Sequence, residues 1–110
     1  MNDSLRAERT EKLVEFGLLI NYIGSINDKP IPPRLVYKLA GYKRLFTAVQ
    51  SDIVLGDVFA STLPVIEYIA QYIRAYNAGN KVAAAGYYRQ AELLWSNVDK
   101  AAEKVVKRIV

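Results

Sequence analysis

The sequence predicts an all-α fold: four main helices packed largely antiparallel, a short helix connecting the second and third, and a long C-terminal helix. Three observations support it. Apolar residues recur at spacings of three and four along most of the chain, as on one face of an α-helix. A chain of 110 residues is long enough for one domain with its own core, and the hydrophobic fraction of 52% argues against disorder. We therefore treat residues 1–110 as a single α-helical domain.

The first helix is expected to begin at Asp3 or Ser4, either of which can cap it, and to end at Gly24. Gly17 lies inside this helix and predicts close packing against a neighbour. The apolar positions expected to face the core are Leu13, Phe16, Ile20 and Ile23. The connection that follows contains prolines at positions 30, 32 and 33, which disfavour helix before them and predict a stiff loop.

The second helix is expected from Pro33 to Val49, because proline suits a first helical position. Its predicted buried residues are Leu35, Leu39, Tyr42, Phe46 and Val49. Residues Ile53–Ala60 predict the short connecting helix, although a buried strand has the same apolar character. A third helix is expected from Ser61 or Thr62, with Pro64 in its first turn, to a C-terminal cap at Gly79.

The fourth helix is expected from Lys81 to Arg108, which corresponds to about 42 Å against about 26 Å for the second and third helices. Its C-terminal third should therefore extend beyond the other helices and leave apolar side chains in water. This predicts self-association or contact with another protein through Trp95, Val98, Ala102, Val105 and Ile109.

Composition removes several kinds of chemistry. The chain has neither cysteine nor histidine, so thiol catalysis, thiolate metal sites and imidazole bases are excluded. The sequence also contains no phosphate-binding glycine loop and no metal-ligand spacing. We therefore expect no catalytic residues, no cofactor and no metal, and a protein that is not an enzyme.

Basic residues concentrate in one stretch. The chain has a formal net charge of +4 and a pI of about 9.4. Residues 29–51 contain five basic side chains and no acidic one. On the second helix, Arg34, Lys38, Lys43 and Arg44 would hold phosphates while Tyr37 stacks on a base, which favours single strands or RNA. The same pattern also fits an ordinary solvated helix face, or a surface that contacts an acidic protein partner.

These observations lead to two hypotheses from different classes. The first is a non-catalytic, nucleic-acid-binding accessory subunit that contacts the phosphate backbone through this basic face. The alternative is a structural, scaffolding or virion assembly protein that acts through helix–helix contacts of the C-terminal helix. The N-terminus does not look like a signal peptide, and charged residues or proline interrupt the apolar stretches, so we expect a cytoplasmic protein without a membrane partner.

Overall fold

The computed structural model describes residues 1–109, without the side chain of Ile109. The described chain contains α-helices and no strand, which confirms the predicted all-α class. The four helices are α1 (Asp3–Ser25), α2 (Arg34–Val49), α3 (Gly56–Asn77) and α4 (Lys81–Ile109).

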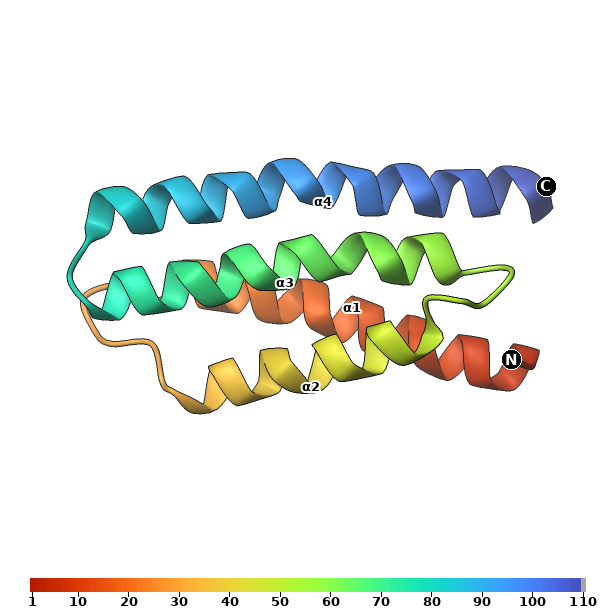
Figure 1. Ribbon diagram of the computed structural model, residues 1–110, viewed down its shortest axis with the longest axis horizontal. Coiled ribbons are helices and arrows are strands. Elements are labelled where there is room, and N and C mark those ends of the chain that lie inside the picture. Colours follow the sequence, from red (N-terminus) through yellow and green to blue (C-terminus); the bar gives the residue numbers. More distant parts are fainter. Residues whose placement is uncertain (110) are drawn as a thin grey trace.

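The helices pack into an elongated body of 45 × 23 × 19 Å. Figure 1 shows that the chain runs back and forth along the long axis, with both termini at one end and the α1–α2 and α3–α4 connections at the other. α3 lies between α2 and α4 and packs most extensively against α4, while α1 passes behind α2 and α3. α3 is thus the central helix of the body.

An aromatic cluster joins all four helices. Phe16 of α1 is fully buried, and its ring centroid lies 5.4 Å from that of Tyr42, 5.7 Å from Phe46 and 5.9 Å from Trp95. Phe46 stacks in turn on Phe59 of α3 at 5.7 Å. Buried aromatic side chains contribute large apolar areas, so this cluster fixes how the helices are rotated against each other. All five residues predicted to be buried on α2 are buried.

The ends of the helices follow from local hydrogen bonds. Asn2, rather than Asp3 or Ser4, caps α1: its Oδ1 accepts a hydrogen bond from the Leu5 N–H at 2.8 Å. At the far end of α3, Gly79 has a positive φ of 80°, and the Asn80 N–H donates to the Ala75 carbonyl. This is the predicted glycine cap, since glycine enters the left-handed region without steric cost.

α3 differs from the prediction because no separate connecting helix precedes it. The helix begins at Gly56 and continues through Pro64. The hydroxyl of Ser61 donates to the carbonyls of Asp57 and Val58, and that of Thr62 donates to Phe59, so both residues bond back to an existing helical turn instead of capping a new one. Burial of Val58 and Phe59 in the core offsets the hydrogen bond that proline cannot make.

A partly buried ion pair joins the α2–α3 connection to α1. Arg6 donates from Nε and Nη2 to both carboxylate oxygens of Asp52, at distances of 3.1 to 3.3 Å. The same carboxylate accepts the N–H groups of Val54 and Leu55 and so organises the turn before α3. The hydrogen bonds from Arg6, with those from the backbone, hold the pKa of Asp52 at about 2, below its ordinary value of 3.8.

Candidate nucleic-acid interface

All five residues predicted to bind nucleic acid lie exposed on α2, and four of them form no ion pair with another described residue. The buried stripe of this helix faces the core, and Arg34, Tyr37, Lys38 and Arg44 project from the remainder of its surface. Tyr37 is 77% exposed, which is unusual for so large a side chain with an apolar ring. Gly41 lies in the same exposed part of α2, and a Cβ added there would meet nothing within 4 Å. The backbone of α2 is therefore open to approach beside Tyr37. We call Arg34, Tyr37, Lys38 and Arg44 the basic face.

The fifth residue, Lys43, has a different environment. Its ammonium group forms an ion pair with Glu67 of α3, so Lys43 lies on the side of α2 that faces α3. Both side chains are about half exposed, and such surface pairs contribute little to stability. The pairing does, however, neutralise the charge of Lys43 in this arrangement. In the described residues, Arg34, Lys38 and Arg44 form no such ion pair.

A groove of about 740 Å³ runs beside the basic face, between α1 and α2. Arg34 and Lys38 line it from α2, and Leu18 and Tyr22 line it from α1. Leu18 is 63% exposed and Tyr22 is 44% exposed, so the α1 side of the groove presents apolar and aromatic side chains beside the carboxylate of Glu15, and the α2 side presents cations. The sequence interpretation missed these two residues, although their spacing of four and their position off the apolar seam of α1 were visible signals.

Tyr42 lies at the base of the groove. Its hydroxyl donates to Glu15 Oε2 at 3.4 Å, and Glu15 also pairs with Lys12. Burial, followed by the negative charge of Glu15, raises the pKa of the Tyr42 hydroxyl. Tyr42 therefore keeps its proton at physiological pH and donates it in the hydrogen bond to Glu15.

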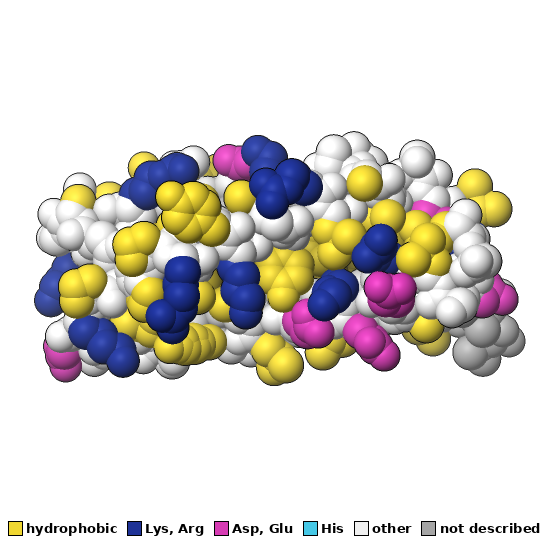
Figure 2. All heavy atoms as spheres, turned by 90° about the horizontal axis from the view of Figure 1, so that it is seen from below, with side chains coloured by type: hydrophobic (Ala, Val, Ile, Leu, Met, Phe, Trp, Pro, Cys, Tyr) yellow, Lys and Arg dark blue, Asp and Glu magenta, His cyan; other side chains and the backbone are white. Residues whose placement is uncertain are grey.

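Figure 2 shows this side of the molecule, on which α2 lies. Lys and Arg side chains gather over the half that is farther from the termini, and hydrophobic side chains lie between them. Most acidic side chains visible in this view lie over the other half. The basic and apolar groups thus form one mixed surface near the beginning of α2.

The apolar seam of α4, predicted as a protein interface, packs within the chain. Val98 is 2% exposed, and Trp95, Ala102 and Val105 are partly buried against the core. The C-terminal third of α4 is expected from its length to extend beyond the other helices. It does so less than predicted, because α3 starts at Gly56 and extends farther along α4 than the sequence indicated. The side chain of Ile109 lies outside the described part of the structure. A partner for this seam remains a prediction.

Two further observations on the described residues concern metal binding and membrane spans. No group of three or more acidic side chains is placed to hold a metal ion in this part of the chain. None of the described helices is long and apolar enough to cross a membrane. Comparison with known protein families, with curated proteins and with solved structures found no match for this chain.

Proposed function

We propose that this protein is a non-catalytic accessory subunit that binds single-stranded nucleic acid or RNA through the basic face of α2. The observation that carries the proposal is the exposure of Tyr37 among Arg34, Lys38 and Arg44, on a helix without acidic residues. A solvated helix face needs no exposed aromatic ring, whereas a base-binding surface does.

Each part of the basic face has a chemical role in this proposal. Arg34 and Arg44 donate charge-assisted hydrogen bonds to phosphate oxygens, and Lys38 adds a flexible cation between them. Tyr37 stacks on an unpaired base, and Gly41 lets the strand approach the helix backbone. Because phosphate contacts carry no sequence information, binding should show little sequence preference.

The groove between α1 and α2 supports the preference for single strands. Bases in a duplex are stacked and paired, so they cannot reach Leu18 or Tyr22, whereas an unpaired base can turn into the groove. The duplex offers only its phosphates to the same surface. The proposed framework behind this surface is an antiparallel bundle, which the short α3–α4 connection and the shared position of the termini support.

The test is fluorescence anisotropy of labelled single-stranded DNA, RNA and duplex at several salt concentrations. Three phosphate contacts on a single strand predict a slope of log affinity against log salt of about −2. Arg34→Gln with Arg44→Gln should make this slope shallower by about 0.7 for each lost contact. Tyr37→Ala should weaken binding by about 1–3 kcal/mol, the range measured for stacking of one base, and Tyr37→Phe should restore most of it.

The matched control removes the same charge elsewhere. Arg89 and Lys100 are exposed on α4, which lies on the other side of α3 from α2. Arg89→Gln with Lys100→Gln should leave both the affinity and the salt slope almost unchanged. Equal weakening by the two double variants would show that binding follows net charge alone. That result, or the absence of binding at low salt, would refute the proposal.

A further inference from the structure

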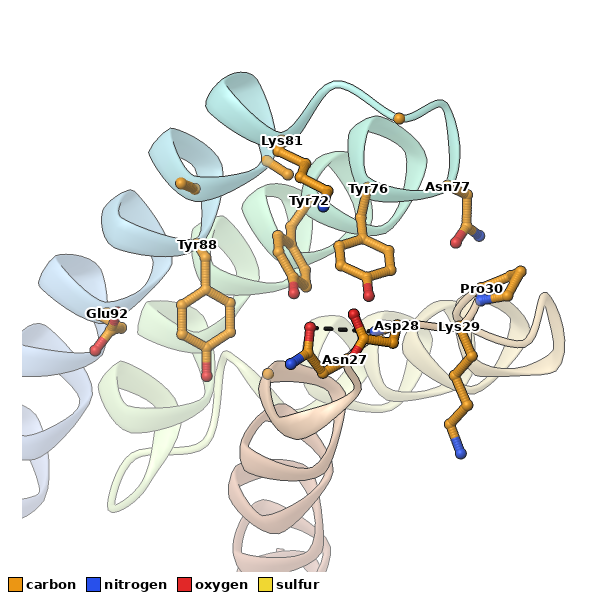
Figure 3. Close-up of a pocket in the computed structure, with 14 residues that line it drawn as sticks. Asn27, Asp28, Lys29, Pro30, Tyr72, Tyr76, Asn77, Lys81, Tyr88 and Glu92 are labelled. Carbon is orange, nitrogen blue, oxygen red and sulfur yellow. Dashed lines mark hydrogen bonds between the residues drawn. The ribbon is translucent and has the colours of Figure 1, made fainter.

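A separate pocket lies at the end of the molecule where the α1–α2 and α3–α4 connections meet. Its volume is about 620 Å³, within the range of pockets that accept small ligands. Figure 3 shows Tyr72 and Tyr76 of α3 and Tyr88 of α4 along one side, with Asn27 and Asp28 of the α1–α2 connection opposite them. None of these residues belongs to the basic face.

Hydrogen bonds hold the walls of this pocket in place. The side-chain amide of Asn77 donates to the Ile31 carbonyl at 3.0 Å and accepts the Ile31 N–H at 2.8 Å, which joins the connection to the end of α3. Asp28 has a positive φ of 59°, and its N–H donates to Asn27 Oδ1. Aspartate tolerates this left-handed backbone better than most residues. These bonds attach the connection to the end of α3 at Ile31 and give Asn27 and Asp28 a local turn.

Tyr72 has an unused polar group in this pocket. The residue is 8% exposed, and its ring contacts those of Tyr76 and Tyr88 at centroid distances of 5.8 and 5.1 Å. Its hydroxyl points toward Asn27 and Asp28, as does that of Tyr76 (Figure 3), and within the described residues it has no hydrogen-bond partner. The ring is packed against its two neighbours, while the hydroxyl reaches the open space of the pocket and is available to a ligand.

Tyr88 closes the side of the pocket next to α1. Its hydroxyl donates to the Ile20 carbonyl at 3.5 Å, and its ring lies directly over Gly24. A Cβ at Gly24 would collide with the Tyr88 ring, so glycine is required there for the ring to take this position. The three tyrosines thus form a fixed aromatic wall.

The acceptors between the loop and the tyrosine hydroxyls favour a positively charged ligand. The carboxylate of Asp28, Oδ1 of Asn27 and the hydroxyls of Tyr72 and Tyr76 all supply oxygen acceptors to it (Figure 3). Of the two lysines that line the pocket, Lys29 directs its ammonium group away, and Lys81 lies near the backbone end of Tyr72. Glu92 also lines the pocket, but it lies on the far side of Tyr88 and its carboxylate points away from Asp28 (Figure 3). Oxygen acceptors beside aromatic rings bind ammonium and guanidinium groups.

We propose that this pocket binds a small organic cation, with its ammonium or guanidinium group between Asp28 and the hydroxyls of Tyr72 and Tyr76. Asp28 supplies the charge, Asn27 and the two hydroxyls accept hydrogen bonds, and the aromatic rings contact the alkyl part and the charge. The whole protein carries a net charge of +4, which repels free cations. Binding of a cation would therefore indicate a local site and not attraction to the protein as a whole.

The test is calorimetric and NMR titration of the full chain with putrescine and with agmatine, which carry ammonium and guanidinium groups. Saturable binding with equal stoichiometry, with shifts of the ring signals of Tyr72, Tyr76 and Tyr88, is expected. The neutral analogue butanediol should not bind. Asp28→Asn keeps a residue that tolerates positive φ but removes the charge, and it should weaken binding by about tenfold. Tyr72→Phe should weaken binding severalfold without changing the thermal midpoint.

Asp57→Asn is the matched control, because Asp57 is an exposed carboxylate at the opposite end of α3. It should bind both amines as the native chain does. Failure of both amines to bind at low salt would overturn the proposal. Equal weakening by Asp57→Asn and Asp28→Asn would do the same, because attraction to any carboxylate would then explain the data. The basic-face variants Arg34→Gln and Arg44→Gln leave this site intact. A failure of the nucleic-acid proposal would therefore not affect the cation proposal, and the reverse also holds.

Discussion

Asp52 connects three parts of the chain through one carboxylate. It pairs with Arg6 at the start of α1, follows the end of α2, and accepts the N–H groups that precede α3. Its side chain is 2% exposed, and that of Arg6 is 18% exposed. Nothing in the local sequence identifies this pair, because its members are 46 residues apart.

The depressed pKa of Asp52 makes the stability of the protein depend on acid pH. The folded-state pKa is about 2 and the ordinary value is 3.8, so the folded state favours the charged carboxylate. Its contribution is complete above about pH 4 and is lost as the pH falls toward 2. Asp52→Asn should destabilise the protein at neutral pH by about 2 kcal/mol, which corresponds to the shift of the pKa from 3.8 to about 2.

The measurement is urea unfolding followed by circular dichroism between neutral pH and pH 2. The difference in the free energy of unfolding between the native chain and Asp52→Asn should shrink as the pH falls through this window. Asp57→Asn, which changes an exposed carboxylate, should show no comparable convergence. A constant difference across the pH range would contradict the assigned pKa and its cause.

At the scale of whole elements, two helix glycines differ in whether the packed structure has room for a Cβ atom. Gly17 of α1 packs against a neighbour, Trp95 of α4, as the sequence predicted. A Cβ added there would meet the ring at 3.5 Å, an ordinary van der Waals distance, so the site has room for a methyl group. A Cβ at Gly56, the first residue of α3, would collide with the Gln50 carbonyl. Backbone atoms cannot move aside as a side chain can.

Alanine substitutions at these two positions should therefore have opposite effects. Gly17→Ala should stabilise the protein by about 0.5–1 kcal/mol, because alanine has the higher helix propensity. Gly56→Ala should destabilise it by about 1–3 kcal/mol, the usual cost of forcing extra volume into a packed site. Thermal unfolding of both variants checks this. Destabilisation by Gly17→Ala would show that α1 and α4 pack more closely than described.

α3 shows how tertiary burial overrides local signals. Ser61, Thr62 and Pro64 form a typical helix start in the sequence, and on that basis the third helix was expected to begin there. The helix instead begins at Gly56, because Val58 and Phe59 complete the buried stripe that continues with Val65 and Ile69. The apolar face was readable from the sequence, but the boundary was not.

At the scale of the whole molecule, α4 is covered by its own chain along the predicted interface. Val98 is buried, whereas Val106, one position beyond the predicted Val105, is 58% exposed. A substitution of the buried Val98 therefore tests the folding of the single chain, and a substitution of the exposed Val106 tests association between chains. This distinction bears directly on the alternative that the protein acts through contacts of its C-terminal helix.

Val98→Asp should unfold or strongly destabilise the protein, by about 4 kcal/mol or more, because it places an unpaired charge in the core. Val106→Asp should leave the thermal midpoint within a few degrees of the native value. Circular dichroism measures stability, and analytical ultracentrifugation measures association. A Val98→Asp chain that stays folded but loses an oligomer present in the native protein would show that Val98 lies between chains.

Much of the candidate site could be predicted because it lies on one helix. Arg34, Tyr37, Lys38 and Arg44 are exposed as expected, since the buried residues at spacings of three and four define the opposite face of α2. The pairing of Lys43 could not be predicted, because Glu67 lies on another helix. The same holds for Leu18 and Tyr22, whose position beside Arg34 depends on how α1 packs against α2.

The sequence by itself determined the helical class, the apolar face of each helix and the concentration of positive charge on α2. These follow from the helical repeat, which is a local property of the backbone. Only the tertiary structure decided which charges are paired, where α3 begins, and which tyrosines meet Asp28. Those outcomes depend on the rotation of each helix in the body, and the packing of Phe16, Phe46 and Phe59 fixes that rotation.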